Sequence, residues 1–205
     1  GVAGGRGFAI EFAGPVARAL PVEGRLTLCN LTIEMGSRSG FVAPDEAVFN
    51  WIKGRPFAPD GAQWDQALAY WRTLFTDADA EFDKELDVDC SHLAPQITWG
   101  TEPSQVIGID GRVPDPTTLD AEKRAPIERA ISYMGLEPGA PIEGLPVGRV
   151  FIGSCTNSRL PDLEIAANIV KGRKVAPGVT AWAVPGSSQV KRDAEARGLD
   201  RIFKD

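Results

Sequence analysis

The C-terminal part of the chain alternates between short apolar segments and longer amphipathic ones. Residues 149–152 and 180–184 have the length and composition of single strands, whereas residues 160–171 and 187–197 have helical periodicity. A strand–helix–strand–helix order is typical of parallel β–α units, because parallel strands need a crossover connection between them. The sequence therefore predicts an α/β fold for residues 149–205.

The preceding residues are predicted to form part of a first α/β domain, residues 1–110. Its expected helices and strands are, in chain order, helices at 13–20, 22–35, 45–53 and 62–75 and strands at 77–89, 96–99 and 105–109. Residues 111–148 are rich in Pro and Gly and contain one expected helix near 126–134, with Pro126 in its first turn. We interpret this segment as the connection to the second domain, residues 149–205.

Acidic residues occupy the odd positions of residues 77–89. Phe82, Leu86 and Val88 lie between them, and this alternation predicts a strand with one solvated acidic face. A calcium-binding loop is the alternative. It is disfavoured because Phe82 stands where such a loop needs Gly and Val88 where it needs Glu.

Composition excludes several classes of function. The net charge of −6 argues against binding nucleic acid or a membrane surface, since both attract basic faces. No apolar run is long enough to span a bilayer. The three cysteines are odd in number and far apart, which is typical of a reducing compartment, so the cytoplasm is predicted.

The first residue is Gly1 rather than Met, and no basic-then-apolar leader follows it. The chain is therefore expected either to have lost a leader or to be an internal piece of a longer protein. Residues 1–7 read GVAGGRG and are expected to be flexible or tightly turning. They do not form a dinucleotide fingerprint, because no strand precedes them.

The most informative segment is residues 150–167, VFIGSCTNSRLPDLEIAA, which places Cys155 in the turn between an expected strand and helix. Ligands usually bind at this end of parallel strands, and a helix amino end stabilises a thiolate. The residues alone leave three interpretations open. Cys155 is an inert buried thiol, a nucleophile that needs the distant His92 as base, or a cluster ligand that needs further cysteines.

Several motifs bear on this choice: GSCTNSR, KGRKVAPG, VPGS, EFAGPVARAL, VEGRLTLCNLTIEMGSRSGFVAPDE and YWRTLF. Together they resemble the aconitase superfamily and, within it, the family of 3-isopropylmalate dehydratase large subunits. The resemblance covers essentially the whole chain. It implies aconitase-type α/β/α units, present in part.

The family's members are iron–sulfur hydro-lyases that interconvert 2- and 3-isopropylmalate in leucine biosynthesis, with a separate small subunit as partner. The resemblance implies the same reaction for the intact protein, by elimination and re-addition of water. A homoaconitase-type hydro-lyase is the enzymatic alternative. An inactive folded scaffold is the alternative from another class, and this chain alone is expected to be inactive and to lack the cluster.

The resemblance also assigns roles to individual residues. Cys155 corresponds to one of three thiolates that hold a [4Fe–4S] cluster, and the family's other two lie in a C-x-x-C motif that this chain does not contain. Asn30 and Glu34 correspond to active-site residues, and their i, i+4 spacing places them on one helical face. Three further residues match no ligand or catalytic position: Cys29, Cys90 and His92.

Overall fold

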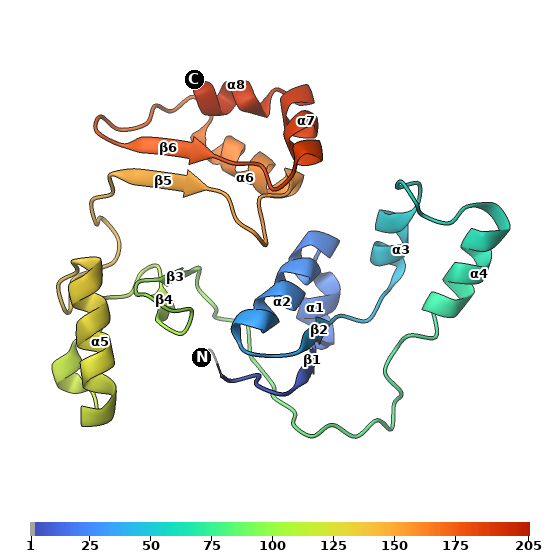
Figure 1. Cartoon of the computed structure of the whole chain (residues 1–205), viewed down its shortest axis with the longest axis horizontal. Helices are drawn as coiled ribbons and strands as arrows, with labels where there is room; N and C mark the ends of the chain where they lie inside the picture. Colours follow the sequence, from blue (N-terminus) through green and yellow to red (C-terminus); the bar gives the residue numbers. More distant parts are fainter. Residues whose placement is uncertain (1–2) are drawn as a thin grey trace. The chain divides into compact units, whose positions relative to one another are not determined.

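The computed structural model describes residues 3–205, in which helices and short strands are mixed (Figure 1). Contacts divide the chain into two compact units. One contains the residues up to Phe8, Glu34–Ser37 and Glu81–Pro146, and the other contains Ala9–Ile33, Arg38–Ala80 and Val147–Asp205. The division into domains 1–110, 111–148 and 149–205 stays a prediction.

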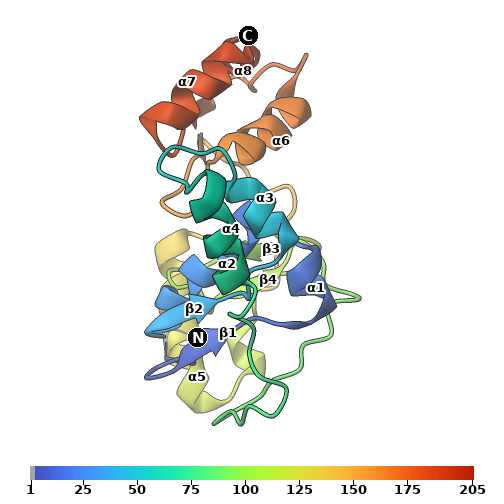
Figure 2. The same cartoon turned by 90° about the vertical axis from the view of Figure 1, so that its right-hand side faces the viewer.

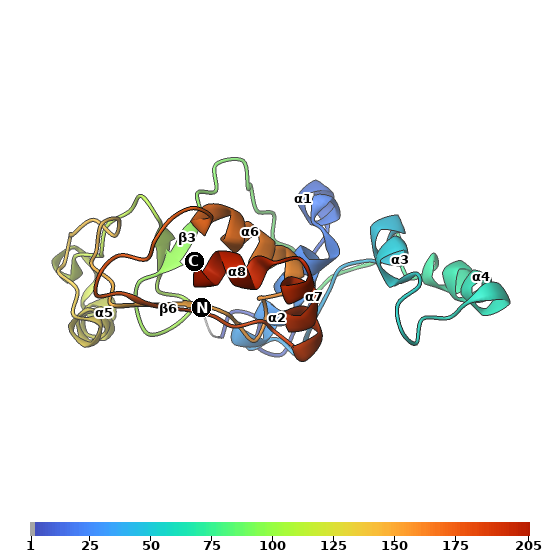
Figure 3. The same ribbon diagram turned by 90° about the horizontal axis from the view of Figure 1, so that it is seen from above.

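The predicted C-terminal β–α units are present. Strand β5 (Arg149–Ile152) pairs in parallel with β6 (Thr180–Ala183), and α6 (Leu160–Val170) connects them. Two helices follow, α7 (Ser188–Ala196) and α8 (Leu199–Lys204), of which α8 was not predicted. The two strands lie side by side with the three helices gathered beside them (Figures 1 and 3).

Burial of apolar side chains holds these three helices together. The cluster contains Leu163, Ala167, Ala194 and Leu199, against which Ile152 of β5 packs. Leu163 and Ala167 are each only 1% exposed, so α6 contributes the most completely buried positions. Removing this apolar surface from water is the dominant favourable term for such a cluster.

The same unit contains a second parallel strand pair, which was not predicted. Strand β1 (Ala9–Glu11) pairs with β2 (Ser39–Phe41), and Figure 2 shows the two side by side. Helices α1 (Gly14–Ala19) and α2 (Val22–Glu34) connect them. Strand β2 approaches α2 closely at Gly40, where an added Cβ would lie 2.8 Å from the Thr32 hydroxyl and 2.9 Å from the Cys29 Cα.

Aromatic side chains pack α3 (Glu46–Ile52) against α4 (Gly61–Trp71). The Phe49 ring is 2% exposed and stacks on Trp71 at 6.0 Å between centroids, and Trp64 meets the same ring edge-on at 5.6 Å. Both geometries are favourable for aromatic pairs. The helix predicted at 62–75 therefore exists, but it ends at Trp71, and Leu74 and Phe75 are exposed.

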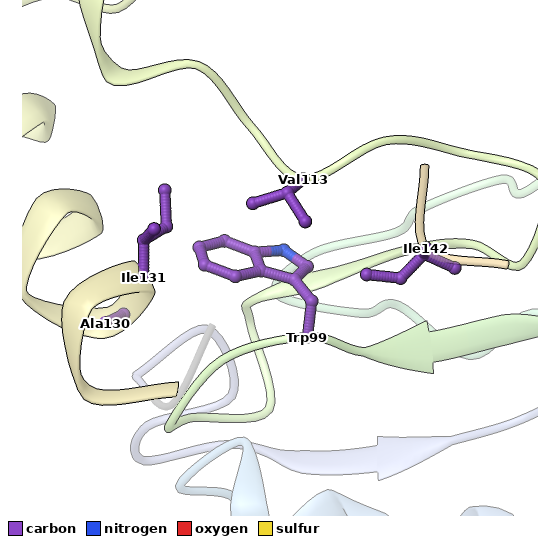
Figure 4. Packing of buried hydrophobic residues seen from close by; sticks show 5 residues of the cluster. All are labelled: Trp99, Val113, Ala130, Ile131 and Ile142. Carbon is purple, nitrogen blue, oxygen red and sulfur yellow. The ribbon is translucent and has the colours of Figure 1, made fainter. Parts of the chain in front are cut away.

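The other unit has its own core around Trp99. Strands β3 (Gln96–Thr98) and β4 (Val106–Gly108) form an antiparallel pair, and the 3₁₀ helix η1 (Pro116–Thr118) precedes α5 (Ala121–Met134). Figure 4 shows the Trp99 ring enclosed by four apolar side chains, Val113, Ala130, Ile131 and Ile142. The chain between α4 and β3 makes no strand in the described residues.

The prediction of a strand at residues 77–89 is wrong. This segment is irregular and exposed, and it runs as a long trace without helix or strand (Figure 1). Phe82, Leu86 and Val88 are 50%, 79% and 67% exposed, so the apolar half of the alternation has nothing to pack against. A strand needs a partner, and local alternation supplies none.

The expected start of the helix near 126–134 is also wrong. Helix α5 begins at Ala121, so Pro126 lies inside it. Residues 121–125 read AEKRA and are strong helix formers. The Arg124 side chain holds the start by donating to the Pro116 carbonyl at 3.1 Å and the Leu119 carbonyl at 3.2 Å. The left-handed Gly135 ends the helix.

Arg25 and Asp45 form a bidentate ion pair between α2 and the start of α3. Both bonds are 2.8 Å long, and the two side chains are 4% and 28% exposed. The Asp45 carboxylate also caps α3 by accepting from the Ala47 amide at 3.0 Å. The Arg25 guanidinium further donates to the Arg18 and Leu20 carbonyls, at 2.7 and 3.0 Å.

We expect Arg25→Ala to destabilise this unit by roughly 3 kcal/mol, because it leaves a partly buried carboxylate and two carbonyls without their donor. Urea denaturation followed by circular dichroism measures the loss. The matched control is Arg72→Ala, whose pair with Glu46 is 53% and 67% exposed. That change should cost less than about 1 kcal/mol. Equal losses for the two variants would contradict the prediction.

The same pair predicts a pH dependence. The hydrogen bond from Arg25 lowers the pKa of Asp45 below its ordinary value. The ion pair therefore stabilises the folded state at pH values above the pKa that Asp45 has in the unfolded chain. This stabilisation is lost as the pH falls through the lower pKa that Asp45 has in the folded chain. Unfolding free energies measured from neutral to strongly acidic pH should fall less steeply for Asp45→Asn than for the unchanged chain. If unfolding free energy fell equally steeply with pH in both proteins, Asp45 would not be the cause of the pH dependence.

Candidate active site

Cys155 lies at the carboxyl end of β5, in the turn that leads into α6, as predicted. Its side chain is exposed, and its sulfur lies 3.7 Å from the Thr156 hydroxyl. The Thr156 amide donates to the Ser154 hydroxyl at 3.0 Å, so the chain curls around the cysteine. A thiol presented in this way is accessible to a ligand.

The VPGS motif holds the turn that contains Cys155 in its conformation. Ser158 has a left-handed backbone, with φ of 66°, and is 4% exposed. Such a conformation is strained for a serine and persists only where contacts hold it. The Ser158 hydroxyl donates to the Val184 carbonyl at 2.5 Å, and the Gly186 amide donates to the Ser158 carbonyl at 2.9 Å. The VPGS motif therefore stabilises the conformation of the GSCTNS motif through hydrogen bonds to Ser158.

Helix α2 contacts the same turn. The Asn157 side-chain amide donates to the Thr27 hydroxyl at 3.1 Å, and the Arg159 guanidinium lies 3.4 Å from the Glu23 carbonyl oxygen. These bonds join residues more than a hundred positions apart in the chain. They bring the helix of the CNLTIEMG motif against the turn of the GSCTNS motif.

Asn30 lies on the side of α2 that faces this turn. A helix rotates about 100° per residue, so Glu23, Thr27 and Asn30 project within one narrow sector. Asn30 is exposed, as is Glu34, the last residue of α2. Neither side chain lines the cavity described next, and their catalytic roles remain proposals.

A cavity of about 610 Å³ opens beside Cys155, within the compact unit that contains Val147–Asp205. Side chains of the Cys155 turn, α2, α3, α6 and α7 line it. Its charged lining residues are Arg55, Arg159, Arg197, Glu23, Glu164 and Asp193. Its apolar lining residues are Trp51, Leu160, Pro161 and Val190. The cavity therefore suits a small polar molecule that also has an apolar part.

The sequence patterns did not single out two residues of this cavity, Trp51 in α3 and Arg55 shortly after the end of α3. The helix predicted at 45–53 contains Trp51 but gave it no role, whereas its indole N–H donates to the Glu23 carboxylate at 2.7 Å on the cavity wall. Arg55 stacks on the Trp51 ring at 3.4 Å from its centroid. The only local signal was the polar Arg55 one turn after an aromatic residue, which is too common to single out.

The remaining cysteines lie on other elements. Cys29 is half-buried on α2, and burial raises the pKa of its thiol, which disfavours the thiolate. Cys90 is half-buried in the irregular segment, and its sulfur lies 3.6 Å from the Val88 carbonyl. His92 is exposed.

Across residues 3–205, no three side chains of His, Cys, Asp or Glu gather as a metal site. Among these residues, Cys155 is the exposed cysteine, and Cys29 and Cys90 are half-buried. None of the helices in this part of the chain is both long and apolar enough to cross a membrane.

Comparison with known sequences defines the class of protein. A family profile described as the aconitase family (aconitate hydratase) matches residues 1–205. The chain therefore belongs to the aconitase family, which confirms the resemblance and the predicted α/β class.

Two curated relatives show which branch it is similar to. The chain is 58% identical over its whole length to "3-isopropylmalate dehydratase large subunit 1" of Bradyrhizobium diazoefficiens, and it spans 43% of that protein. It is also 58% identical over 95% of its length to "3-isopropylmalate dehydratase large subunit" of Cupriavidus necator, and it spans 73% of that sequence.

Proposed function

We propose that these residues belong to the large subunit of an isopropylmalate dehydratase, a hydro-lyase that interconverts 2- and 3-isopropylmalate in leucine biosynthesis. The observation that carries this proposal is the 58% identity, along the entire chain, to a protein with that name. A separate small subunit as partner and a cytoplasmic location are parts of the same proposal.

Within that function, Cys155 is one ligand of a [4Fe–4S] cluster whose other ligands lie outside the described residues. Bound there, the cluster supplies a Lewis acid for the loss of a hydroxyl group. Asn30 and Glu34 help to orient the substrate and the ionisable groups around its leaving oxygen, and of the two only Glu34 can exchange a proton. Support for the role of Asn30 comes from the contact between the turn carrying Cys155 and the Asn30 side of α2. The role of Glu34 rests on the resemblance.

The experiment assays the complete protein with its small subunit, after anaerobic iron–sulfide reconstitution, on 2-isopropylmalate and on homocitrate. We expect isopropylmalate to be turned over with the higher kcat/KM. Preference for homocitrate would instead favour the homoaconitase-type alternative, and absence of turnover on either substrate would contradict the proposal.

A second candidate concerns the 205-residue chain by itself, namely a folded scaffold without activity. The observation in its favour is that the described residues bring a single thiol to the candidate site. We expect this chain to retain no stoichiometric iron or sulfide after reconstitution, because one thiolate does not hold a four-iron cluster. A stable brown protein with a full complement of iron would contradict this.

A further inference from the structure

Two arginines in the cavity beside Cys155 have no acidic partner. Across the described part of the chain, neither Arg55 nor Arg159 makes an ion pair. The third arginine of the cavity, Arg197, is paired with the Glu164 carboxylate. Two guanidinium groups are therefore available to an anion from outside the chain.

Both side chains are held in place without an acid. The Arg55 Nε donates to the Trp51 carbonyl at 2.6 Å, and its Cζ lies over the Trp51 ring, 3.4 Å from the ring centroid. Arg159 is half-buried at the start of α6, where its amide donates to the Asp162 carboxylate at 2.9 Å and its Nη1 reaches the Glu23 carbonyl oxygen. Most of the guanidinium N–H donors remain unused, in the fork geometry that matches a carboxylate.

Two acids of the same cavity accept hydrogen bonds from neutral side chains that also line it. The Glu23 carboxylate accepts the Trp51 indole N–H at 2.7 Å, and Asp193 accepts the Gln189 side-chain amide at 2.8 Å. Formal charges of the lining residues balance, so the cavity has no strong long-range field to attract an anion. Its selectivity for an anion must come from direct contact with Arg55 and Arg159.

The apolar part of the lining limits what that anion is. Trp51, Leu160, Pro161 and Val190 share the cavity with the two arginines, and Leu160 and Val190 also pack against the buried cluster of α6–α8. A simple inorganic anion would leave this apolar surface uncovered. A small organic acid with a short aliphatic branch would cover it and gain from its burial.

We propose that Arg159, assisted by Arg55, binds a carboxylate group of a small branched organic acid in this cavity. The identity of that acid as isopropylmalate rests on the proposed function. If the protein has that function, these two guanidinium groups are contacts that the large subunit itself makes to the substrate. Arg159 is the principal contact because its side chain is less exposed than that of Arg55.

The test uses the 205-residue chain and nuclear magnetic resonance of its arginine Nε–H and tryptophan indole N–H groups during titration with 2-isopropylmalate. We expect saturable shifts at Arg159, Arg55 and Trp51. Arg159→Gln should weaken binding by about tenfold to a hundredfold, the usual effect of losing a charged hydrogen bond. Arg159→Lys should recover part of the affinity, since it restores the charge without the fork.

The matched control is Arg72→Gln, which removes an exposed arginine that is paired with Glu46 and does not line the cavity. Its affinity should stay within about twofold of the unchanged chain, the range expected for an exposed pair. Titration with malate, which lacks the branch, should bind more weakly than 2-isopropylmalate. Absence of saturable binding, or equal losses for Arg159→Gln and Arg72→Gln, would overturn the inference.

A parallel assay separates this inference from the proposed function. In the complete enzyme, Arg159→Gln should raise KM more than it lowers kcat, as expected for a contact made in the ground state and the transition state alike. Binding that depends on Arg159, in a protein that does not turn over isopropylmalate, would refute the proposed function alone. Turnover with an unchanged KM in Arg159→Gln would overturn the inference alone.

Discussion

Glu34→Gln in the complete enzyme is expected to lower kcat by about two to four powers of ten, the usual size of an acid–base contribution. The fold should be unaffected. Within residues 3–205 the Glu34 side chain is exposed and makes no hydrogen bond or ion pair. Glutamine keeps its size and removes only the charge and the ability to exchange a proton.

The position of Glu34 strengthens this expectation. It is the last residue of α2, where a carboxylate faces the negative end of the helix dipole and is unfavourable by a few tenths to about 1 kcal/mol. An acid at this position therefore has no stabilising role in the described contacts. Thermal unfolding of Glu34→Gln should occur at the same temperature as for the unchanged protein or slightly above it.

Glu46→Gln is the matched control for this experiment. Glu46 is also an exposed helical acid, but it lies in the first turn of α3 and pairs with Arg72 at 2.7 Å. Its replacement should leave kcat unchanged. Near-normal turnover by Glu34→Gln, with stability unchanged, would show that Glu34 is only a surface acid.

Elements governed by local sequence were predicted well. Strand β5 and helices α6 and α7 follow from apolar periodicity, which operates over a few residues. The same holds for α2, whose bounds differ from the prediction by one residue. The position of Cys155 in a strand–helix turn also follows from this local pattern, whereas its exposure does not.

Features that depend on distant residues could not be predicted in this way. Local alternation at 77–89 indicated a strand, but whether a strand forms depends on a partner and a surface to cover, and this segment has neither. Strands β1 and β2 are three residues each and were missed because their stability comes from their pairing and from the close approach at Gly40.

The candidate site was likewise predictable only in its locally encoded residues. Motif resemblance identified Cys155, Asn30 and Glu34 as separate residues, but it did not indicate which side chains surround them. Contacts of Arg159 with α2 and of Trp51 with Glu23 join residues from distant parts of the chain. A polar arginine or an interfacial tryptophan has no sequence spacing that distinguishes a cavity wall from an ordinary surface.

Cys155→Ser is expected to remove the cluster from the complete enzyme and to abolish its turnover. Loss of a residue that merely supports a metal ligand costs about 10- to 100-fold in affinity or activity, and loss of a ligand itself should cost more. Serine is nearly the same size, and the Cys155 side chain is exposed, so the turn held by Ser158 and Gly186 should persist. Iron and sulfide analysis and the visible absorption of the reconstituted protein measure the loss directly.

The other two cysteines provide the controls that make this result specific. Cys90→Ser changes a half-buried thiol in an irregular segment, and Cys29→Ser changes one that burial keeps protonated. Both variants should retain iron, sulfide and turnover, although Cys29→Ser should lose some stability because it places a hydroxyl at a half-buried position. If Cys155→Ser retained a full cluster, or if Cys90→Ser lost it, a different thiol would hold the iron, and the turn after β5 would have to be reassigned as a purely structural feature.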